Sequence, residues 1–126
     1  MSVIVTDNGF AADDWTLGWD GPKTLDLGPD ADIGALDLAG VEAIRVAFPS
    51  FSDGRGFTLA RLLRLRGYRG RLRAAGHVIA DQYAMARRAG FDEVEIDNAL
   101  ARRQPEGQWL FRADWRAYDH QSRLRG

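Results

Sequence analysis

The sequence predicts a single α/β domain over residues 1–126, with a central parallel βαβαβ unit at about residues 41–97. Short apolar segments rich in β-branched residues alternate there with amphipathic segments, and each connector holds only a few residues. Helical crossovers between strands imply parallel pairing and right-handed connections. An open sheet and a partial β/α-barrel both satisfy this pattern, whereas a complete barrel needs roughly 200 residues or more.

Side-chain periodicity and the residues that end each element define the unit. VEAIRVAF is the clearest strand because it is rich in β-branched and aromatic residues, and Pro49 ends it. In the helix that follows, Leu59, Leu62 and Leu63 fall on one apolar stripe. Gly67 is a typical C-terminal stop for that helix. The predicted strands span residues 41–48, 72–75 and 91–96, and the predicted helices span residues 57–66, 79–89 and 99–103.

The flanks of the unit carry weaker signals. Residues 1–22 are predicted to be an irregular acidic segment that contains a short strand at 3–6. The irregular structure is expected because glycine, proline and aspartate recur after this strand. An edge strand is expected at 23–27, followed by one helical turn within 30–38 that Asp30 or Asp32 would cap. After the unit, the sequence predicts a turn at 105–107, a last strand at 109–111, a helix at 113–120 and a frayed tail at 121–126.

Charge is unevenly distributed along the chain. Residues 1–43 carry nine acids and one lysine, whereas residues 44–126 carry sixteen arginines and nine acids. Seven arginines lie between Arg55 and Arg73 with no acid among them. Since the whole chain is nearly neutral, we expect the acidic front segment to pack near these arginines and neutralise them. The alternative is that the basic block binds anions, but aromatic residues do not interleave with it, so no nucleic acid is expected as a partner.

Composition excludes several classes of chemistry. The chain has no cysteine, which rules out disulfides, thiolate metal sites and cysteine nucleophiles. With only two histidines, no metal site is predicted, and the lack of a dinucleotide fingerprint leaves no cofactor assigned. No apolar run approaches the roughly 20 residues that span a bilayer, and no secretory signal is visible. We therefore expect a cytoplasmic protein with no membrane partner.

Polar residues follow each predicted strand of the unit. In parallel sheets, ligands bind beyond the carboxyl ends of the strands, and neighbouring parallel strands end at the same edge. The three strand exits would therefore bring a carboxylate, a guanidinium, an imidazole and an amide together. The candidate ligand- or anion-binding residues are Asp53, Gly54, Arg55, Gly56, Arg73, His77, Asp81 and Gln82.

Each of these candidates has a functional and a structural interpretation. The loop DGRG leads directly into a helix, whose free N–H groups and dipole favour an anion that Arg55 could clamp. Alternatively, Asp53 or Thr58 caps that helix and the glycines form a tight turn. His77 has a pKa suited to acid–base chemistry, and Asp81 could orient it from one helical turn away or simply favour the helix dipole.

A series of short motifs runs through residues 47–96. They are FP at 48–49, Phe51, DGRGF at 53–57, ARLLR at 60–64, GY at 67–68, LRA at 72–74, Gly76, DQ at 81–82 and GFD at 90–92. In combination they resemble a known bacterial family, the domain-of-unknown-function family 934, and the resemblance covers about residues 23–100. Members are often called oxidoreductases and are typically encoded beside sulfite reductase and phosphoadenylylsulfate reductase, so the resemblance implies an accessory role in assimilatory sulfate reduction.

The resemblance also orders the functional hypotheses. The family usually has an acid where His77 stands, which weakens His77 as a catalytic candidate, and often a cysteine where Ala89 stands, so no thiol chemistry is assigned there. The better site candidates are the matched residues Asp53, Arg55, Arg73, Asp81 and Gln82. We expect a non-catalytic partner or assembly factor of sulfite reductase or of another sulfate-assimilation enzyme. The alternatives are a small enzyme or sensor that binds an oxyanion or phosphate at residues 53–57, and an oxidoreductase with a bound flavin or nicotinamide. Whether the protein is an enzyme, and whether it forms a homodimer, stay open.

Overall fold

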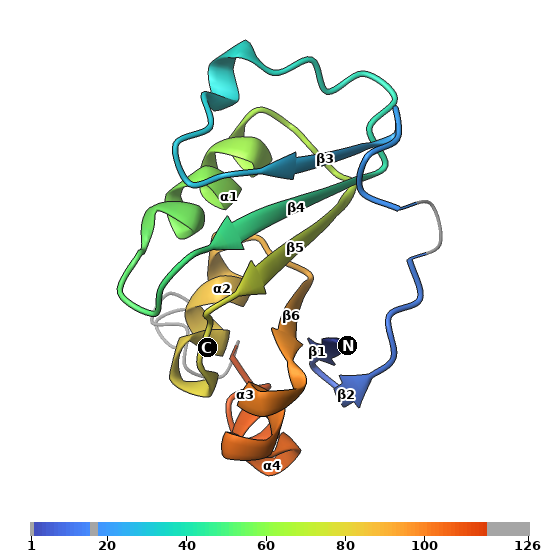
Figure 1. The fold of residues 1–126 in the computed structure, drawn as a ribbon. Coiled ribbons are helices and arrows are strands. Elements are labelled where there is room, and N and C mark those ends of the chain that lie inside the picture. The colour runs from blue at the N-terminus through green and yellow to red at the C-terminus, as the bar shows by residue number, and fades with distance from the viewer. Residues whose placement is uncertain (1, 16–17, 116–126) are drawn as a thin grey trace.

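The protein forms one open, six-stranded mixed sheet with its longer helices packed on one face (Figure 1). The computed structural model describes residues 2–15 and 18–115. The strands lie in the order β2-β1-β6-β5-β4-β3. They are β1 (Ser2–Thr6), β2 (Gly9–Ala11), β3 (Thr24–Leu27), β4 (Ala43–Phe48), β5 (Arg71–Gly76) and β6 (Glu93–Asp97). The helices are η1 (Ile33–Ala35), α1 (Arg55–Leu65), η2 (Ala80–Gln82), α2 (Tyr83–Ala89), α3 (Asn98–Arg103) and α4 (Glu106–Leu110).

The strand directions confirm the predicted parallel unit. Strands β3, β4, β5 and β6 pair in parallel. Helix α1 connects β4 to β5, and η2 with α2 connects β5 to β6. The sheet is open rather than part of a barrel, because β1 and β2 extend it past β6 as an antiparallel hairpin. The expected edge strand is also present, since β3 forms the other edge and pairs only with β4 among the described strands.

The two faces of the parallel strands differ in chemistry because side chains alternate along each strand. One face carries aliphatic side chains such as Ile44, Leu72, Ala74 and Val94, which are fully buried. Helices α1 and α2 cover this apolar face. The opposite face carries charged side chains, and we call it the charged face. Its residues are Arg45 on β4, Arg71 and Arg73 on β5, and Glu93 and Glu95 on β6.

Acids and tryptophans from the segment after β2 lie over the charged face. Asp13 and Asp14 form ion pairs with Arg73 and Arg71. The Arg45 guanidinium lies 4.8 Å from the centre of the Trp19 ring. Together with the Arg45–Asp26 pair at 2.6 Å, these contacts confirm the expected neutralisation by the acidic front segment for Arg45, Arg71 and Arg73.

The structure corrects several predicted elements near the ends of the chain. Residues 109–111 are not a strand, because Trp109 lies in α4 with 1% of its surface exposed. Its indole N–H donates to the Gln104 carbonyl at 2.9 Å. The apolar residues 109–111, which suggest a strand in the sequence, therefore hold α4 against the rest of the protein through the buried Trp109. The front segment is less irregular than predicted, since β2 follows β1. The predicted turn at 105–107 starts α4 instead, with Pro105 at its N-cap.

Two further predictions concern helices. Leu62, expected on the inward stripe of α1, is 42% exposed, because Gly56, Ala60 and Leu63 form the face that packs on the sheet. Of the helix predicted at 113–120, the structure describes 113–115, which are not helical, and the rest lies outside the described residues, as does the tail at 121–126.

None of the helices in the described ranges is long and apolar enough to cross a membrane.

Candidate functional site

The loops that leave β4 and β5 meet at the carboxyl edge of the sheet. Phe48 and Gly76, the last residues of these strands, are register partners. The backbone N–H of His77 donates to the Phe48 carbonyl at 2.9 Å. Further along, the Phe51 ring packs edge-on against the His77 ring, with centroids 5.0 Å apart. The predicted convergence of strand exits at one rim is therefore confirmed for these two strands, and β6 ends beside them.

Gly76 allows this close approach. Its φ of +116° lies in the region that favours glycine. A Cβ at this position would lie 2.7 Å from the Phe48 carbonyl oxygen, closer than any real side chain tolerates. The exit of β5 thus turns against the end of β4 because residue 76 has no side chain.

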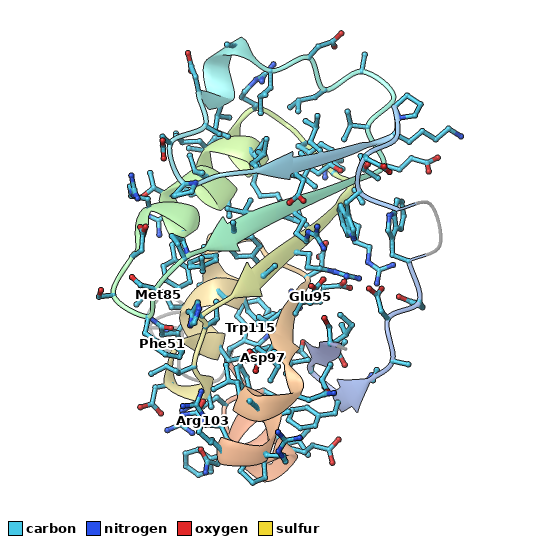
Figure 2. All side chains as sticks on the ribbon, in the orientation of Figure 1. Phe51, Met85, Glu95, Asp97, Arg103 and Trp115 are labelled. Carbon is cyan, nitrogen blue, oxygen red and sulfur yellow. The ribbon has the colours of Figure 1, made fainter. Side chains whose placement is uncertain are left out.

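A small cavity of about 160 Å³, which we call the edge pocket, lies where the three exits meet. Strand β1 closes one side, since Ser2 is the register partner of Asp97 across the antiparallel β1–β6 pair. Figure 2 shows Glu95 and Asp97 on β6, Arg103 on α3 beyond them, and Phe51 on the opposite side. The pocket is lined by Ser2, Phe51, Gly76, His77, Glu95, Ile96, Asp97, Leu100 and Arg103.

The edge pocket contains polar groups of both charges. Asp97 uses one carboxylate oxygen to accept the Leu100 N–H at 2.7 Å, which caps α3. Glu95 accepts from Arg73 at 2.8 Å on one oxygen, and its other oxygen lies 3.5 Å from the Ser2 hydroxyl. The side chains of His77 and Arg103 form no hydrogen bond or ion pair with the described part of the chain. The pocket therefore offers both hydrogen-bond acceptors and cationic donors.

The DGRG loop lies outside the edge pocket, and its charges satisfy each other. The Arg55 guanidinium donates to both carboxylate oxygens of Asp53, at 3.0 and 2.7 Å, and lies 3.4 Å from Asp30. This contact lowers the pKa of the Asp53 carboxyl and raises that of Arg55. Gly54 is the N-cap residue of α1, but the Asp53 carboxylate accepts the Arg55 N–H at 3.1 Å, so Asp53 rather than Thr58 satisfies a backbone donor at the start of this helix. Gly56 has a packing role, since a Cβ there would lie 2.5 Å from the Phe48 ring.

Asp81 and Gln82 have separate partners. The Asp81 carboxylate pairs with Arg112 at 2.5 Å, and no hydrogen bond joins it to His77. The expected pairing one helical turn apart fails because Ile79, between them, has extended backbone angles (φ −94°, ψ 163°) and the helix starts only afterwards. Gln82 has a connecting role, since its side chain accepts from the Ile79 N–H and donates to the Phe51 carbonyl, each at 3.0 Å.

Arg73 lies on the charged face, where it is completely buried. It donates to Glu93 at 2.5 Å, to Glu95 at 2.8 Å and to both oxygens of Asp13 at 2.9 Å. The hydrogen bonds from Arg73 lower the pKa of Asp13 to about 2. Burial by itself lowers the pKa of Arg73, but the surrounding carboxylates outweigh it and raise that pKa above its ordinary value. With these carboxylates, Arg73 holds the front segment on the sheet.

A larger open groove of about 450 Å³ lies on another part of the surface, beside the C-terminal ends of α1 and α2. Two of the three arginines that line it, Arg64 and Arg87, are occupied by the fold, whereas Arg69 forms no ion pair with a described residue. Arg64 donates to the carbonyls of Gly90, Tyr68 and Gly70. Arg87 donates to the Phe91 carbonyl and pairs with Asp7 at 3.1 Å. We therefore regard the edge pocket as the better candidate site. Across residues 2–15 and 18–115, no group of three or more His, Asp or Glu side chains is arranged to hold a metal ion.

Several lining residues were not among the predicted site residues. Glu95 could have been suspected, because in FDEVEI the acids alternate with apolar residues and therefore point away from the core. Asp97 stands at a predicted strand exit. Ser2 and Arg103 carry no local signal, since the pairing of β1 with β6 and the direction of α3 place them at the pocket.

Comparison with known proteins identifies one family. A family model described as a bacterial protein of unknown function (DUF934) matches residues 24–124. The match includes the whole parallel part of the sheet and the three strand exits, whereas β1 and β2 precede it. No curated protein and no solved structure matches the chain at a significant level.

Proposed function

Because the chain belongs to the DUF934 family of bacterial proteins of unknown function, we propose that it is an accessory protein of assimilatory sulfate reduction. In this proposal it acts as a non-catalytic partner or assembly factor and binds sulfite reductase. The pathway is the one that the resemblance to this family implies. The physical support is an apolar groove on the protein surface.

The groove lies between η1 and α1 and has a volume of about 250 Å³. We call it the α1 groove, and it is lined by Ile33, Gly34, Leu62, Leu65 and Arg66. Leu65 is 75% exposed and Leu62 is 42% exposed, although both lie on a helix with a well-buried opposite side. Burying one leucine side chain contributes about 2 kcal/mol. Two adjacent exposed leucines beside a hollow are therefore a favourable binding surface for a protein partner.

Charge near the α1 groove indicates the character of that partner. Arg66 lines the groove, and its guanidinium donates to the carbonyls of Ile33 at 2.6 Å and Leu36 at 3.0 Å but forms no ion pair with a described carboxylate. Most other arginines of the middle segment are paired inside the chain. An apolar partner surface with acidic residues at its rim would complement this groove.

The test is direct binding to sulfite reductase of the same bacterium, measured by biolayer interferometry. We expect the wild-type chain to bind and the double variant Leu62→Glu/Leu65→Glu to bind at least about tenfold more weakly, because two apolar contacts are lost. Met85→Glu is the matched control, since Met85 is 53% exposed on α2 but does not line the groove. No binding by the wild-type chain, or equal binding by the double variant, would contradict the proposal.

A second candidate function is the binding of a small polar ligand at the carboxyl edge. The observation that favours it is the edge pocket itself, in which the exits of three parallel strands contribute side chains with unused hydrogen-bonding groups. An oxyanion such as sulfite, sulfate or phosphate is the ligand expected from the sequence. Calorimetric titration with these anions tests it by comparing the wild type with Arg55→Ala and Arg103→Gln. Equal heats for all three proteins would exclude an oxyanion site at either arginine.

A further inference from the structure

The acceptors of the edge pocket lie along β6. Asp97 caps α3 with one oxygen only, and the second oxygen has no hydrogen-bond partner among the described residues. Glu95 is held by Arg73 and Arg45 through its first oxygen, at 2.8 and 3.4 Å. Its second oxygen has the Ser2 hydroxyl 3.5 Å away. An ammonium group, which is a compact donor of three hydrogen bonds, is the chemical group that matches these acceptors.

The donors of the pocket come from other elements. Arg103 is exposed at the end of α3, and its guanidinium forms no ion pair with residues 2–15 or 18–115. The imidazole of His77 packs against the Phe51 ring but makes no hydrogen bond within those ranges. A guanidinium with free donors matches a carboxylate in a planar, two-bond geometry.

We propose that the edge pocket binds a small zwitterion, a molecule of amino-acid size that carries one ammonium and one carboxylate. The ammonium lies between Asp97 and Glu95, and the carboxylate lies toward Arg103. The inference rests on the second candidate function, ligand binding at the carboxyl edge, and replaces the simple oxyanion expected there. No chemical step is implied, since the assignment concerns binding alone.

Charge and size both favour this class of ligand. A simple anion in the pocket would lie near the carboxylates of Glu95 and Asp97, which repel it, and a simple cation would leave Arg103 unmatched. The cavity of about 160 Å³ has the volume of about five water molecules. That space accommodates an amino acid without a large side chain, and it is well below the size of a nucleotide site.

The experiment is a titration of the full chain followed by ¹H–¹⁵N NMR. The probe is glycine, which has both charges and no side chain that the pocket could exclude. Methylamine carries only the ammonium part, acetate carries only the carboxylate part, and sulfate tests the oxyanion. We expect glycine to shift the amides of Gly76, His77 and Asp97, and each single-charge analogue to bind about tenfold more weakly, because one charge-assisted interaction is missing.

Two pairs of variants test the assigned groups. Arg103→Gln removes the guanidinium, and Arg102→Gln is its control on the same helix, outside the pocket lining. Asp97→Asn removes a charge but keeps an oxygen that can cap α3. Asp32→Asn is the control, because Asp32 likewise caps η1 with one oxygen, away from the pocket. We expect the two pocket variants to weaken glycine binding about tenfold and the controls to leave it unchanged.

The outcomes separate this inference from the function on which it rests. If sulfate shifts the pocket amides and glycine does not, the zwitterion is excluded while an oxyanion ligand at the carboxyl edge stands. If methylamine or acetate binds as tightly as glycine, or if the controls lose as much affinity as the pocket variants, the assignment of both charges is wrong. If no probe shifts these amides, both the inference and the second candidate function are contradicted.

Discussion

Replacing Arg73 with methionine should strongly destabilise the protein. Arg73 is completely buried, and its guanidinium holds Glu93, Glu95 and Asp13 at 2.5 to 2.9 Å. The Glu93 side chain is only 7% exposed. The substitution therefore leaves the Glu93 carboxylate poorly solvated and removes one of the positive charges that offset its burial. Removing one member of a buried ion pair typically costs about 3–5 kcal/mol. Since Arg71 still contacts Glu93 at 2.8 Å, we expect the lower end, a loss of about 3 kcal/mol.

Urea denaturation followed by tryptophan fluorescence measures this loss as a shift of the unfolding midpoint. Trp19 is a suitable local probe, because its ring centre lies 5.1 Å from the Arg73 guanidinium carbon. Arg61→Met is the control, since Arg61 is exposed and should tolerate the change within about 0.5 kcal/mol. Pairing Arg73→Met with Glu93→Leu should recover part of the stability, because no carboxylate is then left at that position. A loss below about 1 kcal/mol for Arg73→Met alone would refute the reasoning.

Two further predictions concern pH and backbone conformation. Because Arg73 lowers the pKa of Asp13 from 3.8 to about 2, the stabilisation is present above pH 3.8 and is lost as the pH falls toward 2. The full shift corresponds to about 2.4 kcal/mol, but the Asp13 side chain is 36% exposed, so we expect about 1 kcal/mol after solvent screening. Comparing the wild type with Asp13→Asn in urea at pH 5 and pH 3 measures it, and an equal pH dependence would contradict it. Gly76→Ala should destabilise the fold by at least about 1–2 kcal/mol, because residue 76 has a positive φ and an added Cβ would clash with the Phe48 carbonyl oxygen. Gly28→Ala is the control, since no atom lies within 4 Å of an added Cβ there, and it should leave the stability unchanged. Thermal unfolding of both variants tests this prediction.

The parallel unit was predictable because its signals are local. The strand at β4 follows from its composition and Pro49, and α1 follows from its apolar stripe and Gly67. A helix between consecutive strands then implies parallel pairing, and parallel pairing places the strand exits on one edge. The pairing of arginines with the acidic front segment could also be predicted, because the whole chain is nearly neutral although its two parts carry opposite charge.

The lining of the site was less predictable. Asp81 and His77 are four residues apart, yet the extended backbone at Ile79 separates their side chains. Arg55 is at a strand exit as expected, but it folds back on Asp53 in its own loop. Neither outcome has a signature in residue spacing, because both depend on backbone angles in short loops.

The amino-acid sequence alone determined which central segments form strands and which form helices, because the periodicity of apolar residues over a few positions specifies each type. The order of these strands and helices then indicated the edge of the sheet at which ligands should bind. The composition of the edge pocket came from long-range packing. Ser2 reaches Asp97 only because β1 joins β6 in antiparallel register across more than ninety residues of chain. That pairing depends on the free energy of the assembled sheet, which no local window of the sequence contains.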